Sequence, residues 1–463
     1  MKKFKKAFGI AMAACLVFSV TGCGSKGNSE STGAGTQSDT AATAETSAPA
    51  ETSAPAENGE KTVINFWHTW SGSEADALQT VIDDYNSSQS DVQVETLASQ
   101  TEDKMLTAIP SGDGPDIIYT ADTTCSKWAE AGMLAPIDDY IAGKGMEVSN
   151  IYESVYKLGN YDEVQYGMPY TMDSYMLFYN KAVLEELNAE PPKTLEEMAE
   201  ISKKAALKDD SGDYTRLGYV PDYPWIDRVE MPYLFGAEFY DFETNQVTCT
   251  SQEFKDAISY KAQYYTDYGI DAVTKFKSGF GTYASADNPF FQGKVVFAIE
   301  GEWFENFINQ YAPENFQWGA VEVPVTESKT ELAGSGRLQG GMLSVSATSK
   351  NAEKAFDVIN YLTSDEAYIK FCAAKGSLPT TYSALKSEEL VSQAPQLKGF
   401  VDTVLAGKAK AFPAVPFSSE YSDGQGLAEE AIYSGDKTVD EALQDLYDEL
   451  QPLADRWVNG NEN

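Results

Sequence analysis

The sequence predicts an α/β fold in which two lobes or domains follow a polar N-terminal segment. Patterns typical of strands and helices alternate along residues 62–134, which favours a mainly parallel sheet covered by helices. About 400 residues follow the polar segment, more than a single hydrophobic core usually organises. Aromatic residues make up 12% of the chain, with 27 Tyr and 7 Trp, so we expect some aromatic faces to be exposed for binding.

The N-terminus has the features of a secretory signal. Lysines within residues 2–6 precede the apolar stretch Ala7–Val20, which is too short to span a bilayer as a mature helix. This stretch ends in Val-Thr-Gly-Cys23, which resembles the lipobox of bacterial lipoproteins. The resemblance implies removal of residues 1–22 and attachment of a diacylglyceryl group to Cys23, whose two acyl chains give stable anchoring. The alternative is an ordinary signal peptide that happens to contain a cysteine.

Residues 23–60 form the polar segment, which we interpret as a lipidated cysteine and a disordered spacer. Residues 24–60 are rich in Ser, Thr, Ala, Gly and Glu, contain no aromatic residue, and repeat the sequence Glu-Thr-Ser-Ala-Pro-Ala at 45–50 and 51–56. Such a composition buries too little apolar surface to offset the loss of chain entropy.

The charge of the chain excludes some partners. The net charge is −37, and loss of four lysines with the signal leaves 30 basic and 71 acidic residues, or −41. This surface repels phosphate backbones, so we expect no nucleic-acid partner. Cys125, Cys249 and Cys372 remain after the N-terminal segment, an odd number that we expect to be three buried thiols; one disulfide and one free thiol is the alternative, which the spacing does not support. His68 is the only histidine, so a protein zinc site is not expected.

Hydrophobic periodicity places the first elements. Thr62–Trp67 has the pattern of a buried strand, and Val92–Leu97 alternates like a second strand. The other expected elements are a helix with Ala77, Leu78, Val81, Ile82 and Tyr85 on one face, a short helix Asp103–Ile109 ended by Pro110 and Gly112, a turn and third strand within 112–119, and a helix Lys127–Leu134. Ligands of parallel sheets bind beyond the carboxyl ends of the strands, so residues 68–72 and 120–124 are candidate binding segments.

An ordered series of motifs carries a family resemblance over nearly all of residues 61–450. The motifs are Gly112-Asp-Gly-Pro-Asp-Ile-Ile-Tyr119, Trp128-Ala-Glu-Ala-Gly-Met-Leu-Ala-Pro-Ile137, Tyr166-Gly-Met-Pro-Tyr170, Leu177-Phe-Tyr-Asn-Lys181, Pro191-Pro-Lys-Thr-Leu-Glu-Glu197, Phe291-Gln-Gly-Lys through Gly301-Glu-Trp303, Trp318-Gly-Ala-Val-Glu-Val-Pro324, Gly340-Gly341, Ser349-Lys-Asn-Ala-Glu-Lys-Ala355 and Thr438-Val-Asp-Glu-Ala-Leu443. The chain resembles the extracellular solute-binding proteins (family 1) of bacterial ABC transporters, most strongly the branch that includes the maltose-binding protein.

The resemblance implies a periplasmic-binding-protein-like fold, with two α/β lobes, each a mainly parallel sheet flanked by helices, and a ligand cleft between them. The implied segments are lobe 1 at 61–169 plus about 327–345, lobe 2 at 174–320 plus about 350–463, and crossings near 169–173, 321–326 and 344–350.

The resemblance and the chemistry of sugars suggest the site. Sugar hydroxyls donate well to carboxylates, and sugar C–H faces stack on aromatic planes. Trp303 stands where the family supplies a stacking indole, and Asp173 where it carries an acidic ligand; a core Trp and a loop Asp are the alternatives. The full set of candidate ligand-binding residues is Trp303, Asp173, Trp70, His68, Asp122, Thr123, Trp225, Asp222, Glu302, Arg337, Gly340, Gly341 and Tyr421. For His68 and Tyr421, a structural or packing role is the alternative.

The hypothesis from sequence is a lipid-anchored, extracytoplasmic carbohydrate-binding protein. It would be a monomer that binds an oligosaccharide, delivers it to an ABC permease by hinge closure, and needs neither catalysis, cofactor nor metal. One alternative is a glycoside hydrolase, which needs two carboxylates about 5–10 Å apart; with 71 acidic residues, chance pairs are common. Another is a cation or polyamine binder that uses acids and cation–π contacts.

Overall fold

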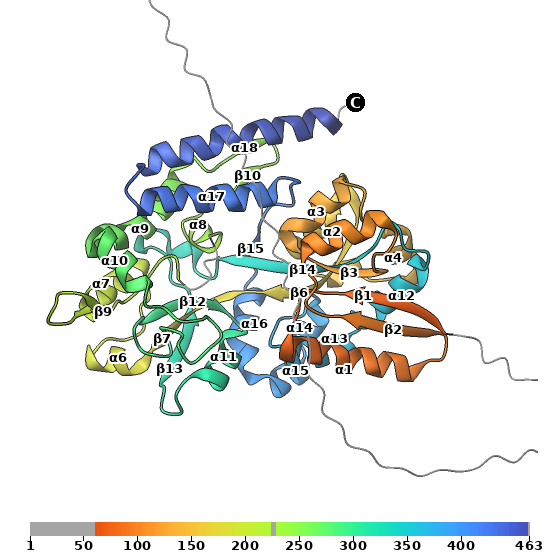
Figure 1. Ribbon diagram of the computed structural model, residues 1–463, viewed down its shortest axis with the longest axis horizontal. Coiled ribbons are helices and arrows are strands. Elements are labelled where there is room, and N and C mark those ends of the chain that lie inside the picture. The colour runs from red at the N-terminus through yellow and green to blue at the C-terminus, as the bar shows by residue number, and fades with distance from the viewer. Residues whose placement is uncertain (1–60, 224–227, 462–463) are drawn as a thin grey trace, which may run out of the picture. The chain divides into compact units, whose positions relative to one another are not determined.

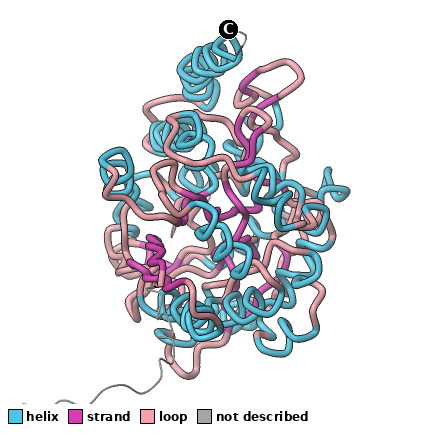
Figure 2. Tube along the Cα trace, turned by 90° about the vertical axis from the view of Figure 1, so that its right-hand side faces the viewer, coloured by secondary structure: helices cyan, strands magenta, loops and turns pink. Residues whose placement is uncertain are grey.

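The structure is a computed structural model that describes residues 61–223 and 228–461 (Figure 1). The expected signal peptide, the lipidated Cys23, the spacer and Trp225 lie outside these residues. In the described part of the chain, no helix combines the length and apolar character needed to cross a membrane. Strands run through the interior, and helices cover them on the outside (Figure 2).

The first sheet is mixed and has six strands in the order β15-β14-β3-β1-β2, with β6 also paired to β14. Its strands are β1 (Thr62–Trp67), β2 (Val92–Leu97), β3 (Ile117–Ala121), β6 (Gly167–Asp173), β14 (Arg337–Val345) and β15 (Lys410–Ala411). β1 is parallel to β2 and β3, whereas β14 is antiparallel to β3 and β6. The two strands predicted at 62–67 and 92–97 are confirmed.

Helices on the first sheet come from both ends of the sequence. They include α1 (Gly72–Ser88), α2 (Glu102–Ser111), α3 (Asp122–Glu130), α4 (Asp138–Lys144), α5 (Glu153–Tyr156), α12 (Ala352–Leu362), α13 (Asp365–Lys375), α14 (Tyr382–Leu385) and α15 (Glu388–Gln393). The predicted apolar face of α1, from Ala77 to Tyr85, is buried. Tyr85 of α1 packs on Tyr361 of α12 with ring centroids 4.9 Å apart, and Lys375 of α13 pairs with Glu74 of α1 at 3.1 Å.

These contacts place α12 and α13 with the first sheet, whereas the sequence-based boundaries assigned 350–463 to the second lobe. Val345 still pairs with Ile117, and Ser346 donates its N–H to Asp116 O over 3.0 Å. The chain therefore stays on the first sheet at 344–350, where a crossing was expected. An amphipathic helix shows in its sequence that it covers a sheet, but not which sheet.

α2 ends at Ser111 and is capped by Gly112, with φ +82°, so the predicted end at Gly112 is confirmed, whereas Pro110 lies within the last turn of the helix. The predicted start of the next helix is wrong. α3 begins at Asp122, not at Lys127, because the chain passes directly from β3 into the helix. The candidate binding segment 120–124 therefore comprises the last two residues of β3 and the first turn of α3.

The second sheet has three strands in the order β12-β7-β13. β7 (Tyr175–Asn180) pairs antiparallel with both β12 (Phe297–Gly301) and β13 (Trp318–Glu322). The two-lobed α/β fold class is confirmed, but the parallel sheet expected in the second lobe is wrong. Residues 181–296 between β7 and β12 contain helices and short hairpins in place of a single crossover helix, so the alternation seen in the first 134 residues does not extend here.

The remaining elements follow the second sheet or connect the two sheets, except the hairpin at 160–165, which precedes β6 and lies in the first lobe, where Ile137 donates its N–H to Gln165 O over 2.8 Å. They are α6 (Lys181–Glu186), α7 (Leu195–Ala205), α8 (Glu230–Leu234), α9 (Gln252–Tyr268), α10 (Ile270–Lys277), α11 (Phe304–Tyr311), α16 (Lys398–Leu405), α17 (Ser418–Tyr433), α18 (Val439–Asn461), and the short strand pairs β4 (Asn160–Tyr161) with β5 (Val164–Gln165), β8 (Leu207–Lys208) with β9 (Tyr214–Arg216), and β10 (Tyr240–Asp241) with β11 (Gln246–Val247).

Three passages link the two sheets. The first is Ser174, which separates β6 from β7, one residue beyond the predicted 169–173. The second lies later than the predicted 321–326, because Ser335 still donates to Tyr233 O over 3.4 Å before β14 begins. The chain returns to the second sheet at α16, where Phe400 lies against Phe178 with centroids 6.4 Å apart.

Cys125, Cys249 and Cys372 are free and buried, as predicted. Burial raises the pKa of the Cys125 and Cys249 thiols to about 12, so both remain protonated and behave as small apolar side chains.

Candidate functional site

Trp303 lies two residues after the end of β12 and is partly exposed. Its Nε1 donates a hydrogen bond to the Tyr283 hydroxyl over 2.9 Å, and that hydroxyl donates to Glu300 Oε2 over 2.7 Å. Glu300 is 2% exposed. Burial raises the pKa of its carboxyl to about 8, although the hydrogen bond from Tyr283 favours the ionised form. At neutral pH the group is therefore mostly protonated, and the chain Trp303–Tyr283–Glu300 carries no net charge.

A second group of buried polar residues lies where β6 passes into β7. Ser174 donates its N–H to Glu302 Oε2 over 3.3 Å. Burial, and then the negative charge of Asp173, hold the pKa of Glu302 well above its ordinary value. Lys375, 7% exposed, pairs with Glu74 at 3.1 Å. Burial by itself would lower the pKa of this lysine, but the charges of Asp173 and Glu74 outweigh it and raise the pKa.

These residues come from distant parts of the sequence. Asp173 ends β6, Glu302 follows β12, Lys375 ends α13 and Glu74 lies in the first turn of α1. The group therefore joins the first sheet, the second sheet and two helices of the first lobe. The group contains three carboxyls, those of Asp173, Glu302 and Glu74, and one ammonium, that of Lys375. The carboxyl oxygens can therefore accept a further hydrogen bond, for example from a ligand hydroxyl.

Arg337, at the start of β14, contacts residues of both lobes. Its guanidinium pairs with Asp122 at 3.1 Å, and its backbone N–H donates to Glu230 Oε2 over 2.5 Å. Gly336 makes this approach possible, because it adopts φ +147° and a Cβ there would lie 2.7 Å from Glu230 Oε1. Glu230 also lines a small pocket together with Tyr219, Pro221, Tyr223, Met231, Lys261 and Ile299.

Tyr223 lines this pocket and also lies near Glu300. Burial, and then the negative charge of Glu300, raise the pKa of the Tyr223 hydroxyl. Ile299 lies on β12, next to Glu300. The predicted residues Trp303, Glu302 and Asp173 therefore lie in one region. The ion pair of Arg337 and Asp122 is connected to this region through Glu230, which accepts the Arg337 N–H and lines the pocket.

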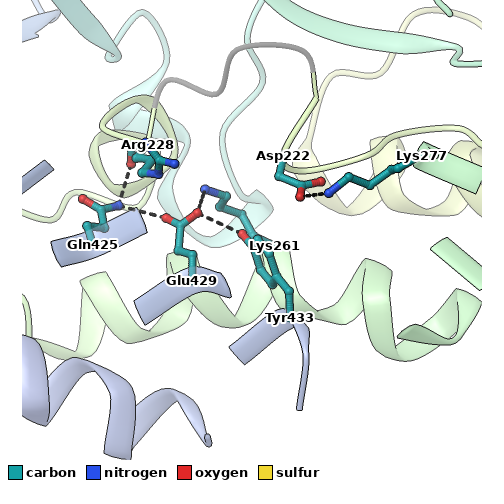
Figure 3. Close-up of polar contacts among 7 residues, drawn as sticks. All are labelled: Asp222, Arg228, Lys261, Lys277, Gln425, Glu429 and Tyr433. Atoms are coloured by element: carbon teal, nitrogen blue, oxygen red, sulfur yellow. Dashed lines mark hydrogen bonds and ion pairs between the residues drawn. The ribbon is translucent and has the colours of Figure 1, made fainter. Parts of the chain in front are cut away.

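Asp222 is engaged within the protein. Its carboxylate forms an ion pair with Lys277, whose ammonium also donates to the Tyr265 hydroxyl over 2.9 Å. Figure 3 shows this pair beside a second one, in which Lys261 donates to Glu429 over 2.6 Å. An Asp that already has a cationic partner is a weaker ligand for a sugar hydroxyl, so the contacts favour a structural role for Asp222. Trp225 lies outside the described residues.

His68 and Trp70 lie in the core of the first lobe. His68 is 1% exposed and sits between Phe66 and Trp70, with ring centroids 5.7 and 5.5 Å away. Burial lowers the pKa of His68 to about 4, so the ring is neutral at physiological pH. Trp70 packs on Tyr119 at 4.0 Å and on Phe371 at 5.3 Å. These contacts favour the packing alternative for both residues.

Three other candidates also have structural explanations. Gly341 lies in β14 under Tyr119, whose hydroxyl would be 1.9 Å from a Cβ, and a Cβ at Gly340 would lie 3.0 Å from Val155. Tyr421 is fully buried between Phe239 and Phe412. Thr123 is different: it is partly exposed in the first turn of α3, where its N–H contacts Asp122 Oδ1 at 2.9 Å.

Sequence reasoning missed Lys375, Tyr283 and Glu230. Lys375 ends a helix before a glycine, an ordinary position for a lysine, so its sequence context carries no signal. Tyr283 lies in the loop between α10 and β12 without any motif around it. Glu230 could have been noticed as an acid within an apolar run, Met231-Pro-Tyr-Leu-Phe235. In the described residues, no group of three or more His, Cys, Asp or Glu side chains could hold a metal ion.

Comparisons with known proteins agree with this architecture. The maltotriose-binding protein of Pyrococcus abyssi is 22% identical over 346 residues, 73% of this chain and 70% of that protein. The structure of CpMnBP1 with mannotriose bound superimposes with a TM-score of 0.73 at 22% identity, covering 85% of this chain and all of that chain.

A third protein, the ABC substrate-binding protein Lmo0181 from Listeria monocytogenes in complex with cycloalternan, gives a TM-score of 0.70 at 20% identity. The superposition covers 85% of this chain and 99% of the Listeria protein. At these identities the superpositions establish the fold, and the family is established by the sequence match of residues 80–399 to the bacterial extracellular solute-binding proteins. The chain belongs to this family of bacterial extracellular solute-binding proteins.

Proposed function

We propose that the chain is a lipid-anchored extracytoplasmic carbohydrate-binding protein that delivers an oligosaccharide to an ABC import permease. The ligand is held between the two lobes, and its contacts with both favour the closed arrangement. The permease then receives the ligand from the closed form. The protein performs no chemistry on the sugar.

The partly exposed indole of Trp303 beside buried carboxyls carries this proposal. Trp303 follows Glu302, and Glu302 lies next to Asp173, so an aromatic plane and hydrogen-bond acceptors are within one region. A sugar ring needs this combination, because its C–H face stacks on an aromatic ring while its hydroxyls donate to carboxylates. Three relatives or structural neighbours carry names or ligands of the oligosaccharide class, namely maltotriose, mannotriose and cycloalternan.

Thermal-shift measurements on the mature protein test the binding proposal. Maltotriose, mannotriose, cycloalternan and spermidine are compared at equal concentrations, and the sugars are recovered afterwards for chromatography. A ligand at 100 times its Kd stabilises the native state by about 2.7 kcal/mol, so we expect a clear increase in Tm with at least one oligosaccharide and intact sugar at the end. An increase with spermidine alone supports the cation-binding alternative, and cleaved sugar supports a glycoside hydrolase.

The membrane anchor is tested separately with the full-length chain. We expect the wild-type protein to sediment with membranes and Cys23→Ser to be released into the extracytoplasmic fraction, because the acyl chains are lost. Cys249→Ser is the control, since that thiol is buried in the folded protein. Equal membrane retention of Cys23→Ser and wild type contradicts lipid anchoring.

A further inference from the structure

We propose that Tyr283 and Gly301 are positioning residues for the Trp303 indole, which they hold so that the ring meets the ligand through its exposed face. The inference rests on the function proposed above and concerns how the site selects its ligand. It is based on three contacts that the protein makes with the indole, from Gly301, Tyr175 and Tyr283.

Gly301 packs against one side of the ring. A Cβ on this residue would lie 2.1 Å from Trp303 Cζ3 and 2.3 Å from Cη2, so any larger residue would displace the indole. The backbone of Gly301 pairs with Tyr175 in the second sheet, and the Tyr175 ring meets the indole edge-on, with centroids 5.9 Å apart and an angle of 88°. The indole is thus fixed against a strand, not against a loop.

Tyr283 accepts the hydrogen bond that the indole N–H donates. Its hydroxyl accepts this bond, because an indole N–H can only donate, and is hydrogen-bonded onward to Glu300. The loop that carries Tyr283 is itself held, because Asn288 donates to Tyr283 O over 2.8 Å and accepts from the Tyr223 hydroxyl over 2.5 Å. Asn288 is fully buried, which restricts the movement of the loop.

The occupied N–H has a consequence for recognition. A hydroxyl of the ligand cannot accept a bond from Trp303 unless the bond to Tyr283 breaks, and breaking it would leave the Tyr283 hydroxyl with one partner fewer. Trp303 therefore contributes stacking only, and the ligand group above it must present a flat C–H face. The carboxyls of Asp173 and Glu302 then distinguish ligands by the orientation of their hydroxyls.

The test uses the mature protein labelled with ¹⁵N in its tryptophan indoles. Wild type gives seven indole signals, one for each Trp, and Trp303→Phe identifies the signal of Trp303. Tyr283→Phe removes the hydroxyl and keeps the ring. Tyr447→Phe is the matched control, because its hydroxyl donates to Gln246 at an exposed position on α18.

In Tyr283→Phe, we expect the Trp303 indole signal to shift and its proton to exchange faster with water. Affinity for whichever of mannotriose or maltotriose wild type binds should fall about fivefold, corresponding to one hydrogen bond of about 1 kcal/mol. Tyr447→Phe should leave both unchanged. Gly301→Ala should weaken binding further; if it fails to fold, Tyr283→Phe still decides.

An unchanged Trp303 signal in Tyr283→Phe overturns the proposal, as does unchanged affinity. If wild type binds no oligosaccharide, the proposed function fails, and the indole signal alone then decides whether Tyr283 fixes the ring. The two failures are therefore distinguishable.

Discussion

Glu300 and Glu302 are two residues apart at the end of β12, and both are almost completely buried, yet their surroundings differ. Glu300 meets the hydroxyl of Tyr283, a neutral partner. Glu302 meets the N–H of Ser174 and the charges of Asp173 and Lys375. Burial raises the pKa of both carboxyls. The partners then separate their roles: one group orients an aromatic ring, and the other links the two sheets.

The comparison shows that burial sets the protonation of an acid, whereas its partners determine what the acid does. A carboxyl that is neutral can be held in an apolar region by a single hydroxyl. A group of carboxyls needs a nearby cation, because each unpaired buried charge is costly.

The largest effect is expected from Glu300→Gln. The folded pKa of about 8 lies above the ordinary value of 4.5, so wild type loses stability as pH rises from about 4.5 to 8, because unfolding lets the acid ionise. At about 1.4 kcal/mol per pH unit, the loss approaches roughly 5 kcal/mol. Urea unfolding of Glu300→Gln between pH 4 and 8.5 should lack most of this slope. Parallel curves for the two proteins would contradict the buried, neutral state of Glu300.

Lys375→Met should cost about 3–5 kcal/mol at pH 7, because it leaves Asp173 and Glu74 without their buried cation. Lys370→Met is the matched control, since its pair with Asp84 is about half exposed and should contribute no more than about 1 kcal/mol. Equal effects of the two substitutions in urea unfolding would show that Lys375 does not neutralise the group.

Trp303→Ala should weaken oligosaccharide binding by at least about 1 kcal/mol in calorimetry without unfolding the protein, because it removes a stacking surface. Trp318→Ala is the control. It pairs with Asn180 at the far end of β7 from the Gly301–Tyr175 pair, and its ring stacks on Phe178, so it should change stability and leave affinity intact. Unchanged affinity in Trp303→Ala would remove this residue from the site.

The smallest effect is expected from Tyr421→Phe. Tyr421 is fully buried between Phe239 and Phe412, so its hydroxyl cannot reach a ligand in this arrangement. Calorimetry should give an affinity within about twofold of wild type, since loss of a direct hydrogen bond would cost about 0.5–1.5 kcal/mol. A larger loss, at unchanged stability, would return Tyr421 to the list of ligand residues.

The sequence predicted local elements and single residues better than their assembly. β1, β2 and the buried face of α1 follow from hydrophobic spacing alone. The neighbourhood of Asp173, Glu302 and Trp303 followed from motif positions. Lys375 and Tyr283 could not be predicted, because they reach the site through tertiary packing from 72 residues beyond and 20 residues before Trp303. The antiparallel second sheet was missed for a similar reason, since pairing direction depends on how the long segments between strands return.

For His68 and Trp70, the contacts favour a different role from the one suggested by sequence position. Their position after β1 suggested ligand contact, yet both are buried against Phe66, Tyr119 and Phe371. Aromatic residues at a strand end are equally suited to a core and to a binding surface, and only the packing distinguishes the two.

The most direct test of the account follows the indole signals of wild type during titration with the oligosaccharide that raises its Tm. The account predicts that the Trp303 signal moves and saturates with the same Kd as calorimetry, because the ligand covers the exposed face of this ring. Saturable binding that moves other indole signals while that of Trp303 stays fixed would contradict it.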